Sequence, residues 1–140
     1  MVILKVKDVI SSLRKTILFN PIWLLGKVLE RNMREVISSC NIKTSEKWLD
    51  LGCGTRPYEQ LFPEGVYIGV DVEESGRGIN LKSPDHFYDG KTLPFPDNSF
   101  DGILSTQVLE HVPEPQLYLL EAARVLKPGG KLILSAPFMY

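Results

Sequence analysis

The sequence predicts an α/β fold built on a mostly parallel sheet of about five strands. From residue 47 onward, short apolar runs that end at turn residues alternate with segments of helical spacing. This is the pattern of strands joined by right-handed helical crossovers. The acidic and polar residues best suited to bind a ligand directly follow these apolar runs, where parallel sheets bind their ligands. The 140 residues, 44% of them hydrophobic, are enough for one core.

Residues 1–45 are expected to form two amphipathic helices ahead of this core, which we place at residues 46–140. Apolar residues recur at helical spacing between Val6 and Ile17, and Asn20-Pro21 is typical of a helix cap followed by the first helical position. The apolar stripe of the second helix is expected to pack on a sheet or to cover a site, and the alternative is a basic amphipathic helix that lies in a membrane interface. The segment holds eight Lys and Arg against three Asp and Glu, which favours peripheral contact with an anionic membrane or a solvated basic face.

The predicted strands are apolar runs bounded by turn residues. They are expected at residues 47–51, 67–71, 86–89, 101–106 and 131–137. Short helical stretches are expected at 57–62 and 108–112. A longer helix is expected from Pro115 to just before Pro128-Gly129, because proline and glycine cannot continue it. Its expected apolar face is Leu119, Leu120, Ala123 and Leu126.

The stretch after the first strand predicts a nucleoside-cofactor site. Gly52 and Gly54 let the backbone turn sharply and let a ligand approach it without a Cβ in the way. A dinucleotide-binding loop would have a third glycine, but that position holds Pro57. Asp50 would repel a phosphate and suits an ammonium group, whereas Asp71 is placed to accept hydrogen bonds from ribose hydroxyls. The pattern therefore favours a nucleoside that carries an amino acid moiety.

Five motifs follow one another in order along residues 48–137. The first is Leu49-Asp50-Leu51-Gly52-Cys53-Gly54 and the second is Ile68-Gly69-Val70-Asp71. The other three lie at residues 89–101, 108–112 and 121–130. This series resembles the class I S-adenosylmethionine-dependent methyltransferases, in particular the subgroup often called type 11. The resemblance implies a Rossmann-like three-layer sandwich with S-adenosylmethionine as its cofactor.

The resemblance also implies which residues touch the cofactor. They are Asp50, Gly52, Cys53, Gly54, Asp71, Val72, Asp89, Gly90, Ser105 and Gln107. The glycine loop and Asp50 would hold the methionine part, with Cys53 as the small residue between two glycines. Asp71 would bind the ribose and Asp89 the adenine amino group. Ser105 would meet the amino acid end through its backbone, and Gln107 would border the space for the methyl acceptor.

Methyl transfer from a sulfonium requires alignment of the acceptor and, for some acceptors, removal of a proton. His111 is the candidate base, and the alternative is a histidine that satisfies a helix end. No metal site is expected, because Glu110, His111 and Glu114 would need a further ligand. Arg56 is expected to pair either with the cofactor carboxylate or with a neighbouring acid.

Composition bounds the location and the partners. Cys40 and Cys53 do not make a disulfide framework, and the start of the chain lacks the order of a signal peptide. A cytoplasmic protein is therefore expected. A net charge of −1, with no basic and aromatic interleaving near the site, argues against nucleic acid as a partner. The expected acceptor is a small molecule or a lipid or glycan precursor.

The fifth predicted strand lies at an edge. Leu132-Ile133-Leu134 is apolar on both faces, as in a strand buried within a sheet, but the final strands of the family fold are absent after it. Either the chain is truncated or another chain covers the edge, which predicts a homo-oligomer. Three functional hypotheses follow: an active methyltransferase, a cofactor-binding fragment without turnover, and an NAD-dependent oxidoreductase, which the missing third glycine disfavours.

Overall fold

The structure is a computed structural model that describes residues 21–73 and 82–137, and their side chains from residue 26 onward. The chain divides into two compact units, Met1–Ser39 and Cys40–Tyr140. The helix predicted between residues 6 and 17 lies outside the described residues. The predicted boundary between residues 45 and 46 stays a prediction.

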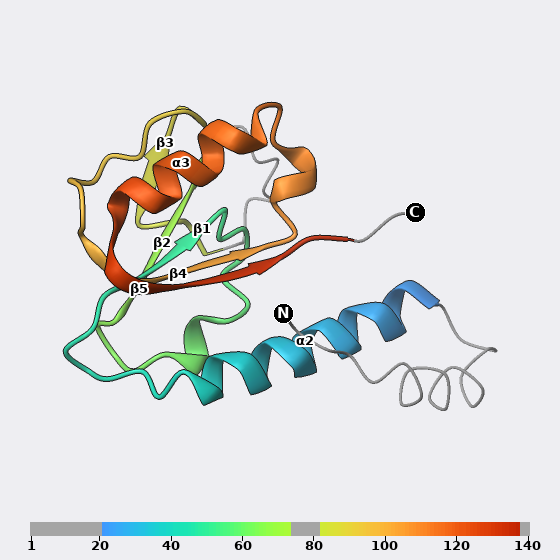
Figure 1. Ribbon diagram of the computed structural model, residues 1–140. Helices are drawn as coiled ribbons and strands as arrows, with labels where there is room; N and C mark the ends of the chain where they lie inside the picture. Colours follow the sequence, from blue (N-terminus) through green and yellow to red (C-terminus); the bar gives the residue numbers. More distant parts are fainter. Residues whose placement is uncertain (1–20, 74–81, 138–140) are drawn as a thin grey trace. The chain divides into compact units, whose positions relative to one another are not determined.

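The described part of the first unit is helix α2, Pro21–Ser39 (Figure 1). It begins at the predicted proline, whose fixed φ suits the first turn of a helix. On its surface Glu30 pairs with Lys27 at 3.2 Å and with Arg34 at 3.0 Å. No helix among the described residues is long and apolar enough to cross a membrane.

The second unit is built on one five-stranded sheet. Its strands are β1 (Trp48–Leu51), β2 (Tyr67–Val72), β3 (His86–Tyr88), β4 (Phe100–Thr106) and β5 (Leu126–Ser135). The strand order is β3-β2-β1-β4-β5, and every neighbouring pair is parallel. The predicted α/β class and parallel sheet are therefore confirmed. Because the order reverses between β1 and β4, ligands are expected outside the carboxyl ends of these central strands.

Strand β5 begins five residues earlier than the sequence predicts, at Leu126. Phe100 of β4 pairs with Leu126, whereas Gly102 pairs with Lys131, so the residues between form an irregularity in the ladder. Gly129 has a φ of 77° within this stretch, a conformation that glycine adopts without strain. Strand β5 thus includes Pro128, Gly129 and Gly130, although these residue types taken alone predict a turn.

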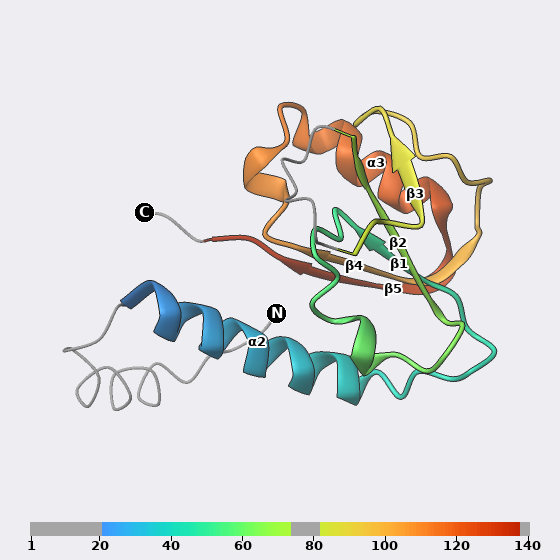
Figure 2. The ribbon, with the colours of Figure 1, turned by 180° about the vertical axis from the view of Figure 1, so that it is seen from behind.

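Helix α3 (Pro115–Val125) starts at the predicted proline and lies along one face of the sheet (Figures 1 and 2). Its apolar face differs in part from the predicted one: Leu119 and Leu126 pack against the core as predicted, but Ala123 is exposed. The buried residues are Tyr118, Ala122 and Val125, whereas Leu120 is 65% exposed. Tyr118 replaces a leucine in this face because its hydroxyl finds hydrogen-bond partners in the sheet. The short predicted helices are 3-10 turns, η1 (Glu59–Leu61) and η2 (Leu109–His111).

The two faces of the sheet bury different side chains. The face toward α3 holds an aliphatic and aromatic cluster of Leu49, Leu51, Val70, Leu93, Phe100, Ile103, Tyr118, Ala122 and Val125. On the other face the rings of Trp48, Phe62 and Tyr67 follow one another at centroid distances of 5.6 and 5.3 Å. Gly102 leaves room for the Trp48 ring, since a Cβ at this position would overlap it. Alternation along β1 therefore sends its side chains into two packed layers.

Candidate cofactor site

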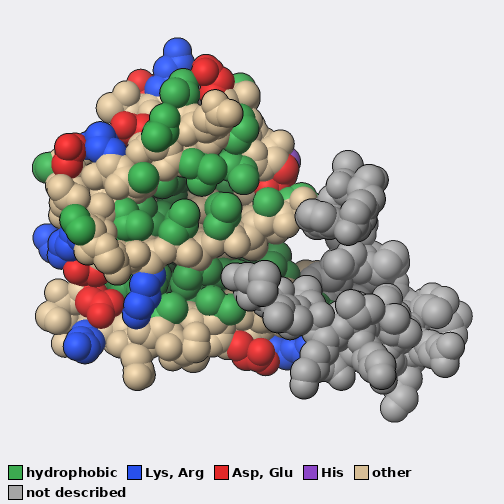
Figure 3. Space-filling view, in the orientation of Figure 1, with side chains coloured by type: hydrophobic (Ala, Val, Ile, Leu, Met, Phe, Trp, Pro, Cys, Tyr) green, Lys and Arg blue, Asp and Glu red, His purple; other side chains and the backbone are tan. Residues whose placement is uncertain are grey.

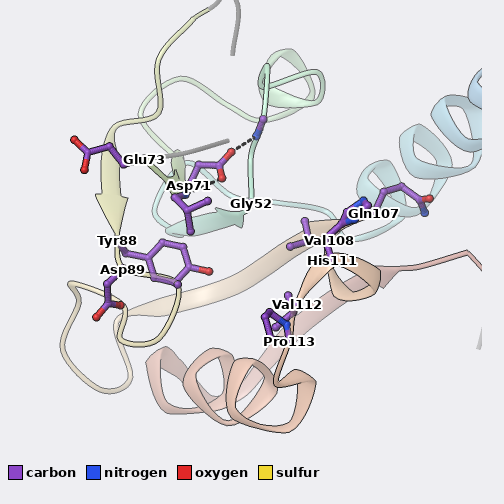
Figure 4. A pocket seen from close by; sticks show the side chains of 13 residues that line it. Gly52, Asp71, Glu73, Tyr88, Asp89, Gln107, Val108, His111, Val112 and Pro113 are labelled. Carbon is purple, nitrogen blue, oxygen red and sulfur yellow. Dashed lines mark hydrogen bonds between the residues drawn. The ribbon is translucent and has the colours of Figure 1, made fainter. Parts of the chain in front are cut away.

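A cavity of about 950 Å³ opens at the carboxyl ends of the central strands. Figure 4 shows that its lining comes from two groups of residues: one at the ends of β1, β2 and β3, the other from the segment that follows β4. The lining residues are Gly52, Gly54, Asp71, Val72, Glu73, Tyr88, Asp89, Gly90, Gln107, Val108, His111, Val112 and Pro113. Eight of the predicted site residues are thus brought together.

The glycine loop after β1 is tied to the end of β2. The amides of Gly52 and Cys53 donate to Val70 O at 2.9 and 3.1 Å, and the Gly54 amide donates to Asp71 Oδ2 at 2.9 Å. Gly52 has a φ of 78°, and a Cβ there would lie 2.5 Å from Val108 Cγ2. Glycine is therefore required at this position both by conformation and by space.

Asp71 is the acid at the end of β2, where sequence analysis placed the ribose ligand. Its Oδ1 accepts a hydrogen bond from the Val72 amide at 2.7 Å, while its Oδ2 accepts from Gly54. The two amides orient the carboxylate, which is 7% exposed and lines the cavity. The loop and the acid therefore form one rigid unit.

The wall from β3 carries Tyr88, Asp89 and Gly90. Asp89 Oδ1 accepts hydrogen bonds from the amides of Thr92 and Lys91, both at 2.8 Å, which lower the pKa of its carboxyl. Burial raises the pKa of Tyr88 to about 12, so its phenol keeps the proton at neutral pH. Figure 4 shows the Tyr88 ring directed into the cavity. This wall combines an ionised acceptor with an aromatic face.

The opposite wall carries the residues predicted to border the acceptor. Gln107 has a φ of 54°, and its amide donates to Ser135 O of β5 at 2.9 Å. His111 lies in η2 with its side chain 78% exposed, and its Nε2 is 3.9 Å from Glu110 Oε1. The side chains of Val108, Val112 and Pro113 add an apolar surface beside the imidazole.

Asp50, Cys53 and Ser105 do not lie among the residues that line the cavity. Asp50 is 1% exposed inside the sheet, where the Tyr67 hydroxyl donates to its Oδ2, and no described group bonds to its Oδ1. Burial raises the pKa of Asp50 to about 7. Ser105 Oγ shares a 2.7 Å hydrogen bond with the Tyr118 hydroxyl beneath α3. The cofactor contacts of these three residues stay predictions.

Arg56 pairs with neighbouring acids, the second of its two predicted alternatives. Its guanidinium donates to Asp85 Oδ1 and Oδ2 at 3.0 and 2.8 Å and to Glu59 Oε1 at 3.1 Å, and it lies 5.1 Å from the centroid of the Tyr67 ring. Asp85 Oδ2 also accepts from the Gly69 amide at 2.7 Å. Burial alone would raise the pKa of Asp85, but these hydrogen bonds lower it. Arg56 therefore joins the segment after β1 to Asp85, just before β3.

Sequence reasoning missed several residues at the site. Glu73 and Tyr88 stand at the ends of predicted strands, a position that makes them candidates for the cavity wall. Asp85 carried no local signal, because its partner Arg56 is 29 residues away in the sequence. Within residues 21–73 and 82–137, no three His, Cys, Asp or Glu side chains gather as metal ligands do.

The chain is similar in sequence to known methyltransferases. A family model described as a methyltransferase domain matches residues 49–134. The demethylmenaquinone methyltransferase of Symbiobacterium thermophilum is 34% identical over 127 residues, covering 78% of this chain and 51% of that protein. The enzyme of the same name from Paenarthrobacter aurescens is 32% identical over 125 residues, covering 83% and 48%. The chain thus spans about half the length of these curated relatives.

Solved structures give the same result for the fold. The YcgJ protein from Bacillus subtilis has a TM-score of 0.59 and 26% identity, covering 69% of this chain and 46% of that chain. The [4+2]-cyclase SpnF has a TM-score of 0.58 and 27% identity, covering 74% and 43%. Together with the family match over residues 49–134, these likenesses show that the chain belongs to the class I S-adenosylmethionine-dependent methyltransferases of the type 11 group.

Proposed function

We propose that this protein transfers the methyl group of S-adenosylmethionine to a small molecule or a lipid or glycan precursor. One observation carries the proposal. The Gly54 amide and Asp71 Oδ2 are joined at 2.9 Å on the wall of a cavity of about 950 Å³. This hydrogen bond joins the glycine loop to the acid that is suited to bind ribose. Both line one cavity that is large enough for a nucleoside and a second small molecule.

The residues present suit this cofactor. Gly52 has a positive φ and no room for a Cβ, so it leaves bare backbone toward the cavity for the methionine part. Asp71 would hold the ribose hydroxyls, because an ionised carboxylate accepts several hydrogen bonds. Val72 and Tyr88 would lie against the adenine, and Asp89 would accept from its amino group. The bound cofactor supplies a methyl group that is activated by the positive charge of its sulfonium, and the remaining sulfur is a neutral thioether.

The protein's own work is alignment and proton removal. Val108, Val112 and Pro113 form an apolar wall that would seat the acceptor and exclude water from the methyl group. His111 lies beside them at the cavity edge and would take the acceptor's proton. Relatives that bear the name demethylmenaquinone methyltransferase support an acceptor of the small-molecule or lipid class.

We further propose a cytoplasmic location and an association of two chains through β5. The proposal for β5 is supported by Leu132 and Leu134, which are 44% and 39% exposed on this edge strand. Peripheral contact of residues 1–45 with a membrane rests on their basic composition alone. Sedimentation with and without anionic vesicles tests both associations.

Two measurements test the proposed activity. Calorimetric titration with S-adenosylhomocysteine and with NAD is expected to show binding of the first only, and the reverse result would make the protein a dinucleotide-binding one. Radiolabelled methyl transfer to a metabolite extract then tests turnover. His111→Gln is expected to lower kcat by about 10² or more if His111 is the base, with cofactor affinity unchanged. Binding without any labelled product would reduce the proposal to a cofactor-binding protein.

A further inference from the structure

The loop between β3 and β4 begins at the cavity wall and is held from helix α3. Residues 89–99 contain no strand or helix, so their backbone groups need partners other than a ladder. Two of these partners are the side chains of Glu121 and Arg124, which we call the α3 clamp. Neither of them lines the cavity. Both residues belong to the fifth motif, at residues 121–130, so this motif also contacts the loop between β3 and β4.

Arg124 uses all five of its guanidinium N–H groups. Nε and Nη2 donate to Glu121 Oε1 and Oε2 at 2.8 and 2.9 Å. Nη2 also donates to Leu93 O at 3.1 Å, and Nη1 donates to Phe95 O and Asp97 Oδ1 at 2.9 and 2.8 Å. A planar fork with five donors satisfies this set, whereas a lysine ammonium has only three. The position thus requires the guanidinium shape as well as its charge.

Glu121 completes the clamp from the same helix. Its Oε2 accepts a hydrogen bond from the Leu93 amide at 2.9 Å, so both backbone groups of Leu93 are bound to the clamp. The hydrogen bonds from Arg124 lower the pKa of Glu121, which keeps it ionised at neutral pH. The Leu93 side chain is 2% exposed in the core. This residue is therefore fixed by packing and by two polar contacts.

The clamp acts close to the cavity wall. Asp89 Oδ1 binds the amides of Lys91 and Thr92, so the chain from the wall to Leu93 has a backbone contact at nearly every step. Gly90, between them, has a φ of 78° and lies on the wall. A displacement of Leu93 would therefore move the Asp89 carboxylate.

We propose that Arg124 and Glu121 are positioning residues that set Asp89 for recognition of the adenine amino group. The inference rests on the proposed function, because it takes adenine to lie at Asp89. A side-chain pair on the outer part of α3 thereby decides nucleoside selectivity without touching the ligand. If the ion pair served only stability, its loss would lower the melting temperature and leave selectivity unchanged.

The test compares two ligands that differ at the adenine amino group. The full chain is titrated with S-adenosylhomocysteine and with S-inosylhomocysteine, in which a carbonyl replaces that amino group. Arg124→Lys and Glu121→Gln are expected to weaken binding of the adenine compound by about tenfold, the equivalent of one hydrogen bond to a charged group, and to reduce the preference over the inosine compound. In turnover assays KM for the cofactor rises and kcat at saturation stays the same.

Two control variants bracket the effect. Arg34→Lys alters another Arg–Glu pair, formed within α2 of the first unit, and is expected to leave both affinities unchanged. Asp97→Ala removes only the partner that is 69% exposed, so a change below about twofold is expected, as for a solvent-exposed ion pair. Circular dichroism and melting confirm that each variant is folded.

The titrations separate this inference from the proposed function, and amide exchange of the unliganded protein tests the contact between the clamp and the loop. Arg124→Lys is expected to speed exchange at Leu93, Lys91 and Thr92. If the wild type binds no S-adenosylhomocysteine, the proposed function fails, and with it the inference. If the wild type prefers the adenine compound and Arg124→Lys keeps the same affinity and preference, the inference alone is overturned, whatever the exchange rates.

Discussion

The Tyr67 hydroxyl donates a hydrogen bond to Asp50 Oδ2 in the interior of the sheet. The two residues stand on neighbouring parallel strands, and Asp50 precedes Gly52 of the glycine loop by two positions. Asp50 is 1% exposed, and among the described groups none bonds to its Oδ1. A buried carboxylate with one donor is costly in its charged form. The pair therefore makes the stability of this region depend on pH.

Asp50→Asn is expected to stabilise the protein above about pH 7. Burial raises the pKa of Asp50 from 3.8 to about 7 in the folded state, so the folded chain keeps a proton that the unfolded chain loses. The contribution of Asp50 to the free energy of unfolding of the wild type therefore falls as the pH rises from 4 to 7, and it stays constant above pH 7. The variant avoids this loss, and its free energy of unfolding should exceed that of the wild type by about 1–3 kcal/mol at pH 8.

Urea denaturation from pH 4 to pH 8 measures this difference. Asp101→Asn is the control with the opposite sign, because the hydrogen bond from Lys127 lowers the pKa of Asp101. Its stabilisation is present above pH 4 and is lost as the pH falls, so the variant is weaker than the wild type at neutral pH. A gap between Asp50→Asn and wild type that did not vary with pH would contradict the assignment.

Gly52→Ala is expected to damage the cofactor loop more than Gly65→Ala. Both glycines have a φ of 78°, so each alanine bears the same conformational cost of about 1 kcal/mol. Only at Gly52 does the new Cβ meet Val108, whereas nothing lies within 4 Å at Gly65. Overpacking should add about 1–3 kcal/mol of destabilisation at Gly52 and displace Val108 from the cavity wall. Thermal melting and calorimetry with S-adenosylhomocysteine report the two effects, and equal losses would show that space is not the constraint.

Asp71→Ala is expected to weaken S-adenosylhomocysteine binding by about 1–3 kcal/mol. The change removes the acceptor proposed for the ribose hydroxyls and the contact that holds the Gly54 amide. Asp71→Asn keeps an oxygen for that amide and should lose less. Asp101→Ala, an acid away from the cavity lining, serves as the control. Unchanged affinity in Asp71→Ala would mean that the ribose lies elsewhere.

Tyr118→Phe is expected to reduce stability by about 1 kcal/mol without changing cofactor affinity. The lost hydroxyl donates to Leu51 O at 3.2 Å and shares a hydrogen bond with Ser105 Oγ at 2.7 Å. A double-mutant cycle with Ser105→Ala should show coupling between the two, since each side chain is the other's partner. If Ser105→Ala alone weakened S-adenosylhomocysteine binding, the serine would act at the cofactor rather than at the contact between α3 and the sheet.

The exposed leucines of α3 show where local pattern reading fails. Leu117 and Leu120 are 51% and 65% exposed. Figure 3 shows hydrophobic side chains among charged ones on the surface of the second unit. The sequence predicts Leu120 on the apolar face of this helix together with Leu119, Ala123 and Leu126. Tyr118 is buried instead, since its ring fills the core and its hydroxyl reaches two polar groups of the sheet. The burial of Tyr118 thus depends on hydrogen-bond partners in the sheet, which the sequence of the helix does not reveal.

The sequence by itself determined the strands, the glycine loop and the family. Short apolar runs, closely spaced glycines and acids that follow the apolar runs are local properties of the sequence, so they are visible without the structure. Tertiary structure alone decided where the polar side chains go. Arg56 bonds to Asp85 and Arg124 bonds to Phe95 O, each partner 29 residues away in the sequence. Within such a separation the sequence offers many other acids and carbonyls as partners. Such partners are selected by how the elements pack, because a buried charge takes whichever group the fold brings within reach.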